Sequence, residues 1–140
     1  MPAKDLFLSD AREDLTRAAG LVSIFKKQGW SVWWDVEDIP AGKRFDETIE
    51  EALSSVKAVV VLWSRHSVKS SYVIDEASEA EELQTLIPVL IDEVKVPFRF
   101  KRLQTADLRG WDGASHPGLA KLLKDVEALV GKALSRPRMP

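Results

Sequence analysis

Apolar residues in this chain follow two alternating patterns. Short runs in which almost every residue is apolar or aromatic predict strands, and the longest of them is Ala58–Trp63 (AVVVLW). A continuous β-branched run indicates a central parallel strand covered on both faces, since a half-exposed strand would alternate apolar with polar residues. Similar runs predict further strands over Asp5–Ser9, Trp30–Trp34, Thr85–Ile91 and Thr105–Leu108. Pro88 argues against a fully regular ladder in its strand.

Between these runs, apolar residues recur at three- and four-residue spacing, which predicts helices. The stripes extend over Leu15–Phe25, Phe45–Val56, Val73–Ala80 and Leu119–Ala133. Because strand and helix alternate along the chain, we expect an α/β fold. It would be a single flavodoxin-like domain with a five-stranded parallel sheet in the order 2-1-3-4-5 and helices on both faces.

The loops after the first and third strands are the predicted ligand site. In this strand order, ligands bind beyond the carboxyl ends of those two strands, where Ser9–Arg12 and Ser64–Ser71 lie. Glu76 follows on the apolar stripe of the next helix, so its carboxylate should point inward. Buried carboxylates are rare unless they are paired or functional, so Glu76 is the candidate catalytic residue. The competing interpretation is a structural Glu paired with an Arg or Lys.

Composition narrows the classes of function. With 140 residues and 45% hydrophobic content, the chain fits one domain. The absence of Cys excludes thiol catalysis, Cys zinc sites and disulfides. A net charge of −2, with both signs interspersed, shows no footprint for nucleic acid. No apolar run approaches the roughly 18 residues of a membrane span, and the N-terminus has no signal-peptide profile. We therefore expect a cytoplasmic domain with no nucleic-acid or membrane partner.

Other catalytic motifs are absent. His66 and His116 have no partner ligands at a recognisable spacing, so we expect surface or capping roles and no metal. The serines lack a G-x-S-x-G motif, and the Gly42-Lys43 pair is no phosphate-binding P-loop. A receiver-type phosphoacceptor has the same fold, but it needs an Asp at the end of the third strand, where this chain has Ser64.

Taken together, three segments resemble the TIR domain (toll/interleukin-1 receptor homology domain), especially its bacterial members. They are DLFLSDARED (Asp5–Asp14), GWSVWWDVEDIPAGK (Gly29–Lys43) and SSYVIDE (Ser70–Glu76). The resemblance covers roughly Lys4–Val130 and implies a TIR domain over residues 1–134. The tail over residues 135–140, rich in Pro and Arg, would then be a flexible linker to another domain, such as a sensor.

The resemblance also implies an activity. Many TIR domains are NAD⁺ glycohydrolases or cyclases, and their catalytic glutamate, four residues after an aromatic, falls on Glu76. That aromatic is Tyr72 here, where Trp is commoner, and Asp10 stands where the family usually has Tyr. In NAD⁺-cleaving TIR domains, the loop after the first strand often carries an arginine, and the so-called BB loop after the second strand carries an acidic residue. Arg12 and Glu37 stand at these positions here. The implied substrate contacts are Ser9, Asp10, Ala11, Arg12, Trp34, Glu37, Ser71 and Tyr72.

One carboxylate suffices for this chemistry. The leaving group of NAD⁺ is a cationic pyridinium that departs as neutral nicotinamide, so no acid has to protonate it. Glu76 would bind the ribose hydroxyls and stabilise the oxocarbenium-like transition state. Water or an adenine nitrogen would complete the reaction, giving ADP-ribose or a cyclic isomer, and the sequence does not decide between them. NAD⁺ is the substrate, and no cofactor is expected.

The resemblance further implies association with other TIR domains through the BB loop, Asp35–Lys43. The expected interface residues are Ile39, Pro40, Gly42 and Lys43. The resemblance implies that such assembly activates the domain in bacterial immunity, cell-death signalling or virulence. The alternative from another class is a non-enzymatic TIR scaffold that mediates protein interactions and cleaves nothing. NAD⁺ turnover distinguishes the two.

Overall fold

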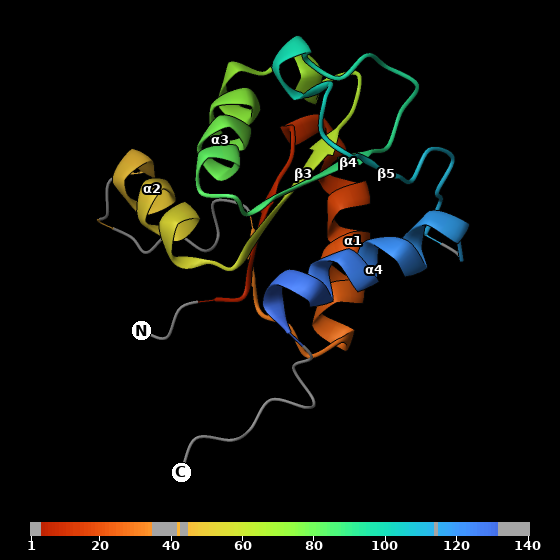
Figure 1. The fold of residues 1–140 in the computed structure, drawn as a ribbon, viewed down its shortest axis with the longest axis horizontal. Coiled ribbons are helices and arrows are strands. Elements are labelled where there is room, and N and C mark those ends of the chain that lie inside the picture. The colour runs from red at the N-terminus through yellow and green to blue at the C-terminus, as the bar shows by residue number, and fades with distance from the viewer. Residues whose placement is uncertain (1–3, 35–41, 43–44, 114, 132–140) are drawn as a thin grey trace.

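The computed structural model of the chain describes residues 4–34, 42, 45–113 and 115–131. Strands and helices alternate, as predicted (Figure 1). Short 3₁₀ turns occur at Arg12–Asp14 (η1), Ser67–Lys69 (η3) and Phe98–Phe100 (η4). In chain order, the main elements are β1 (Leu6–Ser9), α1 (Leu15–Lys27), β2 (Val32–Trp33), α2 (Phe45–Ser55), β3 (Ala58–Trp63), α3 (Ser71–Glu82), β4 (Leu86–Leu90), β5 (Ala106–Asp107) and α4 (Pro117–Val130).

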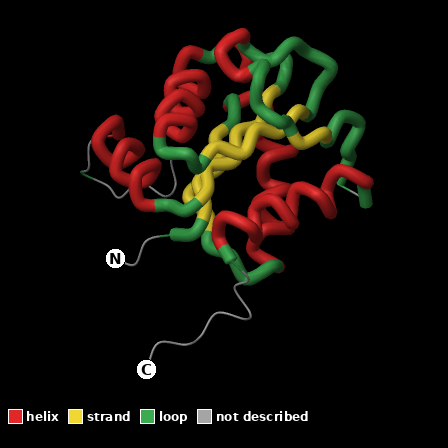
Figure 2. Tube along the Cα trace, viewed as in Figure 1, coloured by secondary structure: helices red, strands yellow, loops and turns green. Residues whose placement is uncertain are grey.

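The sheet has five parallel strands in the order β2-β1-β3-β4-β5, which confirms the predicted topology. Figure 2 shows the strands as one twisted layer between helices. β1 and β3 run side by side, with Leu6 opposite Ala58 and Ser9 opposite Val61. The direction of winding changes between these two strands, so their carboxyl ends meet at the predicted ligand edge.

Side-chain alternation divides the core into two layers. Leu6 and Leu8 of β1 point toward α1 and α4, whereas Phe7 points toward α2 and α3. Figure 1 shows these helix pairs on opposite sides of the sheet. Because successive side chains of a strand face opposite ways, Ser9 shares the face of Phe7. The end of β1 therefore presents a hydroxyl to α3.

β3 is the most deeply buried strand. None of its residues, from Ala58 to Trp63, is more than 1% exposed, as expected for a central strand covered on both faces. Trp63 packs against Phe100 of η4 with the ring centroids 5.5 Å apart. Burial of a large apolar side chain contributes roughly 1.5–3 kcal/mol, so this strand anchors both layers and fixes where its following loop begins.

Pro88 fits into β4 because of which way its missing N–H would point. Ile91 donates its backbone N–H to Trp63 O (3.0 Å), so the odd-numbered residues of β4 direct their backbone N–H and C=O groups toward β3. Pro88 faces the β5 side, where pairing begins only at Val89. No ladder hydrogen bond to β3 is lost, and the strand stays continuous.

Two predicted boundaries are wrong. β2 covers only Val32–Trp33, because Trp30 packs against Phe25 and donates its indole N–H to Gly131 O (3.2 Å). α4 ends at Val130, short of the predicted stripe end at Ala133, which lies outside the described residues. The helix ends there because Gly131 has a φ of 90°, a conformation that favours glycine.

The start of α4 lies directly on β5. A Cβ atom at Gly118 would lie 1.9 Å from Asp107 O, so only glycine allows this close approach. His116 caps the helix, since its Nδ1 accepts the backbone N–H of Gly118 at 2.9 Å, which confirms a capping role for this histidine. No helix in the described ranges is both long and apolar enough to cross a membrane.

Candidate functional site

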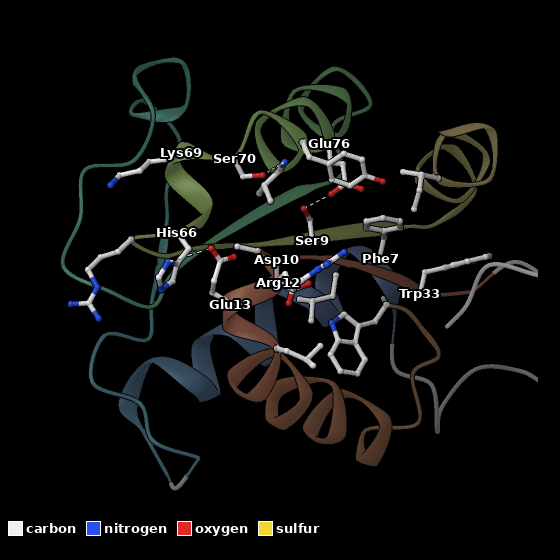
Figure 3. A pocket seen from close by; sticks show the side chains of 18 residues that line it. Phe7, Ser9, Asp10, Arg12, Glu13, Trp33, His66, Lys69, Ser70 and Glu76 are labelled. Carbon is white, nitrogen blue, oxygen red and sulfur yellow. Dashed lines mark hydrogen bonds and ion pairs between the residues drawn. The ribbon is translucent and has the colours of Figure 1, made fainter. Parts of the chain in front are cut away.

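A cavity of about 850 Å³ opens at the carboxyl ends of β1 and β3, the predicted ligand edge. Its walls come from the β1–α1 loop, β2, α2, the β3–α3 loop and α3 (Figure 3). The residues lining it are Phe7, Leu8, Ser9, Asp10, Ala11, Arg12, Glu13, Leu15, Trp33, Trp34, Ile49, Arg65, His66, Lys69, Ser70, Tyr72, Val73 and Glu76. Segments far apart in the sequence thus form one site.

Glu76 lies in the wall of this cavity. It belongs to the buried stripe of α3, between Val73 and Ala77, and is 6% exposed. Ser9 Oγ donates a hydrogen bond to Glu76 Oε1 at 2.6 Å, drawn as a dashed line in Figure 3. This bond fixes one carboxylate oxygen. Within the described residues, no Arg or Lys pairs with Glu76, so the ion-paired structural interpretation does not hold.

Burial raises the pKa of Glu76 to about 7. The negative charges of Asp10 and Asp75 raise it further, and the hydrogen bond from Ser9 opposes them by stabilising the ionised form. Near neutral pH, the carboxylate is therefore close to half ionised. A buried carboxylate with a pKa near 7 in a cavity is typical of functional sites.

The cavity differs from one end to the other. Phe7, Trp33 and Ile49, which belong to the core layer under α2 and α3, form an apolar and aromatic end, whereas Trp34 packs against the layer under α1 and α4. The β3–α3 loop contributes the cationic groups Arg65, His66 and Lys69, and Arg12 lies beside Ser9 (Figure 3). Figure 3 shows Trp33 and Lys69 on opposite sides of the Ser9–Glu76 pair. Tyr72 lies along the wall with 43% of its surface exposed, so its ring is accessible to a ligand.

A buried polar cluster joins the two loops behind the cavity. Asp14, 2% exposed, accepts a short hydrogen bond from Ser64 Oγ and another from Arg17 Nη2 at 2.6 Å. Ser64 Oγ also accepts the backbone N–H groups of His66 and Ser67, at 3.1 and 3.0 Å. Asp14 follows β1 and Ser64 follows β3, so this cluster sets the separation of the cavity walls.

Arg17 extends the cluster to the end of β4. Its guanidinium bonds both oxygens of Asp92, at 2.8 and 3.1 Å. This contact, together with the backbone N–H of Arg65, holds the pKa of Asp92 at about 2. Asp92 in turn accepts that N–H at 3.0 Å. A carboxylate from a third loop therefore ties down the loop that follows β3.

Most predicted site residues meet at the cavity. Those that line it are Ser9, Asp10, Ala11, Arg12, Trp34, Tyr72 and Glu76. Ser71 does not, because it begins α3 on the exposed side; Ser70 lines the cavity instead and caps α3 by accepting Val73 N–H at 3.2 Å. Glu37, Ile39, Pro40 and Lys43 lie outside the described residues. Gly42 is described; it is exposed, with a φ of 85°.

Sequence reasoning missed several residues of the site. Arg65 and Lys69 line the cavity, as does His66, whose Nδ1 lies 3.8 Å from Glu13 Oε2. The available signal was the β3–α3 loop itself, because any charged residue after a switch-point strand is a candidate. The Asp14 cluster had no comparable local signal. In the described part of the chain, no group of His, Cys, Asp or Glu residues could hold a metal ion.

Comparison with known proteins decides the family. A sequence profile described as TIR domain matches residues 6–123, most of the chain. This chain belongs to the TIR domain family. No curated protein sequence matches it significantly.

Solved TIR structures share the fold. The TIR domain of the Toll-related receptor TRR-2 from Hydra magnipapillata has 20% identity and a TM-score of 0.78, with 89% of this chain and 99% of that chain covered. The TIR domains of the activated Roq1 resistosome have 18% identity and a TM-score of 0.71 over the same shares. A TIR-STING receptor from C. gigas has 19% identity and a TM-score of 0.70, covering 99% of this chain and 41% of that one. At these identities, the likeness concerns the fold alone.

Proposed function

We propose that this TIR domain cleaves the nicotinamide–ribose bond of NAD⁺, as a glycohydrolase or cyclase, with Glu76 as the catalytic residue. The observation that carries the proposal is the buried Glu76 carboxylate, bonded by Ser9 at 2.6 Å, on the wall of a cavity at the switch point of the sheet. A buried, perturbed carboxylate in a cavity, with no ion-pair partner among the described residues, is better explained by catalysis than by stability.

The geometry supports a simple mechanism. Nicotinamide leaves as a neutral molecule, so the protein has to stabilise positive charge on the ribose rather than protonate a leaving group. Glu76 in its ionised form supplies a fixed negative charge in a site of low dielectric, where it acts strongly. Asp10 adds a second negative group nearby. Because Ser9 occupies Oε1, the other oxygen of Glu76 is left for the ribose hydroxyls.

The aromatic end of the cavity suits nicotinamide. Trp33 presents a flat aromatic ring in the layer of the core that α3, the helix of Glu76, also covers. Cations and heterocycles bind to aromatic faces with a gain of about 0.5–1 kcal/mol at exposed sites and more when they are desolvated. After bond cleavage, water yields ADP-ribose, and an adenine nitrogen yields a cyclic isomer.

The test is nicotinamide release by purified protein at high concentration. Glu76→Gln and Glu76→Ala should each lose most activity, at least about 100-fold, because a neutral side chain cannot stabilise the developing cation. Glu79→Gln is the matched control, since it makes the same change three residues along α3, away from the lining residues. Equal rates for wild type and Glu76→Ala would falsify the catalytic role. No turnover by the wild type under any assembly condition would instead favour a scaffold.

We also propose that activity depends on self-association, in a cytoplasmic signalling role in bacterial immunity or virulence. The Roq1 TIR domains, which share the fold of this chain, belong to an activated resistosome. In such an assembly, the segment around Gly42 would contact a neighbouring copy. Specific activity should then rise with protein concentration, and Ile39→Asp should flatten that rise without unfolding the monomer, as circular dichroism would verify. Constant activity per molecule over a roughly hundredfold dilution would contradict this requirement.

A further inference from the structure

The connection between β4 and β5 carries the most exposed large apolar side chain in the described part of the chain. Phe98 lies in the η4 turn with 87% of its surface exposed, whereas the next most exposed, Leu15, is at 44%. Figure 1 shows this turn, in teal, at the edge of the molecule beside α3. The cavity at Glu76 contains none of its residues. Scattered apolar residues at a surface are normal, so the surroundings of Phe98 decide what its exposure means.

The turn holds Phe98 in this outward position. Phe100, two residues further on, is fully buried and packs against Trp63 with the ring centroids 5.5 Å apart. The backbone N–H of Phe100 donates to Pro97 O at 2.8 Å, and that of Lys101 donates to Phe98 O at 3.2 Å. Because Phe100 fills the core beneath the turn, Phe98 projects into solvent from an ordered backbone. A side chain presented in this way loses little entropy on binding, which favours contact with something outside the molecule.

Positive charge is concentrated around Phe98. Residues 94–106 contain no Asp or Glu, in a chain whose net charge is −2, and they include four exposed cations: Lys95, Arg99, Lys101 and Arg102. A local excess of one sign, in a chain whose overall charge has the other, indicates a partner that carries the opposite charge.

Three of these cations are not neutralised by the protein. Arg99 pairs with the nearby carboxylates of α3, with its Nε 3.1 Å from Glu81 Oε1 and its Nη2 4.0 Å from Glu82 Oε1. Over the ranges that the structure describes, Lys95, Lys101 and Arg102 form no ion pair. Lys101 Nζ lies 5.6 Å from the centroid of the Phe98 ring. The turn therefore presents an apolar tip with positive charge beside it.

We propose that the η4 turn binds the surface of an anionic lipid bilayer, with Phe98 inserted among the headgroups and the three free cations beside the lipid phosphates. An apolar side chain flanked by Lys and Arg is the combination that binds such surfaces, and charge complementarity with the phosphates selects this partner. A nucleic-acid strand would stack on several aromatic residues in a groove, and a stable protein interface would need roughly 800 Å² of complementary surface. A single projecting tip matches neither. The proposal is independent of the chemistry at Glu76, because it uses no residue of the cavity.

This contact departs from the expectation that the domain has no membrane partner. That expectation rests on the overall charge and on the lack of a spanning segment. A surface contact depends instead on a local excess of cations, and it inserts one side chain rather than a helix. One apolar tip and three cations give weak, reversible binding, so domains held together in an assembly would bind more tightly than a single domain.

The first experiment measures co-sedimentation of the purified domain with vesicles. We expect binding to phosphatidylcholine vesicles that contain about one-third phosphatidylserine, little binding to phosphatidylcholine alone, and weaker binding at high salt. Phe98→Ser should lower the partition coefficient about fivefold to tenfold, and Lys101→Gln about fivefold. Leu129→Ser and Lys124→Gln, which make the same kinds of change at exposed positions of α4, are the matched controls and should bind like the wild type. Because all four side chains are exposed, circular dichroism should show an unchanged fold.

The second experiment locates the contact on the domain. The chain has no Cys, so Gln104→Cys and Ala128→Cys each introduce one site for an environment-sensitive fluorophore. Gln104 follows η4 closely, Ala128 lies on α4, and both are exposed. When anionic vesicles are added, we expect the emission of the label at position 104 to rise and that of the label at position 128 to stay constant.

Several outcomes would overturn the proposal. Wild-type protein that binds neither type of vesicle, or both equally, would remove the role of the cations. Vesicle binding that Phe98→Ser leaves unchanged would place the contact elsewhere on the domain. Loss of self-association in Phe98→Ser without lipid, measured by analytical ultracentrifugation, would make the turn an interface between copies of this chain instead.

Discussion

Ser9 at the end of β1 donates its hydroxyl to Glu76 on α3, at 2.6 Å and across 67 positions of the sequence. The bond crosses from the sheet to a covering helix on the face where Phe7 packs. It stabilises the ionised form of a carboxylate that burial drives toward the neutral form. This opposition keeps Glu76 near half ionisation at neutral pH, so small changes around it should be visible in a pH–rate profile.

Removing the Ser9 hydroxyl should shift the acidic limb of that profile to higher pH. In Ser9→Ala, the carboxylate loses its hydrogen bond, so the pKa of Glu76 rises above about 7. If the ionised form is the active one, kcat/KM near pH 7 falls several-fold and partly recovers near pH 8.5. Ser9→Thr keeps a hydroxyl and is the control. A limb that stays at the wild-type pH in Ser9→Ala would contradict this role.

Asp10→Asn should move the same limb in the opposite direction. The Asp10 charge raises the pKa of Glu76, so neutralising it makes ionisation of Glu76 easier. We expect the limb to move down by about half a pH unit at low salt and by less at high salt. Asp75→Asn removes a charge that contributes less to the raised pKa and should cause a smaller shift of the same sign. The measurement is kcat/KM for NAD⁺ as a function of pH, and an upward shift would count against the argument.

Glu76→Gln should stabilise the protein at alkaline pH. Burial raises the pKa of Glu76 from about 4.5 to about 7, so the folded state binds the proton more tightly than the unfolded state does. The contribution of Glu76 to the free energy of unfolding is therefore fully present below about pH 4.5 and is lost as the pH rises through about 7, whereas Gln stays neutral. Denaturant unfolding should show the stability of Glu76→Gln relative to wild type increasing by roughly 3 kcal/mol between about pH 4 and pH 8. A pH-independent difference would mean that the carboxylate is solvated.

The Asp14 cluster should contribute to stability as a unit. Asp14→Ala leaves Ser64 Oγ and Arg17 Nη2 without their buried acceptor and should lower the free energy of unfolding by roughly 3 kcal/mol. Ser64→Ala should lower it by about 1–2 kcal/mol. Since the two side chains share one hydrogen bond, the double variant should cost less than the sum. The exposed pair Lys121–Asp125 is the control, and Asp125→Ala should change stability by no more than about 0.5 kcal/mol. Additive losses in urea unfolding would show that the residues act independently.

The fold and the central carboxylate could be predicted from local patterns. The continuous apolar run of β3 and the helical stripes gave the element order, and alternation of strands and helices restricts the topology to few solutions. The three- and four-residue spacing of Val73, Ala77 and Ala80 placed Glu76 on the inner face of α3 before any contact was known. Helix periodicity is a property of neighbouring residues, so it can be read along the chain.

The partners of Glu76 and the polarity of its cavity were decided only by tertiary structure. The Ser9–Glu76 bond depends on how β1 packs beneath α3, and the cluster of Asp14, Ser64 and Asp92 joins loops that follow three different strands. The placing of Lys69 at one end and Trp33 at the other depends on the parallel register of the sheet, which brings the β3–α3 loop and β2 to the same cavity. Hydrogen bonds and ion pairs are short-range and directional, so they form only where packing brings distant segments to within a few ångströms, and no local pattern in the sequence records that distance.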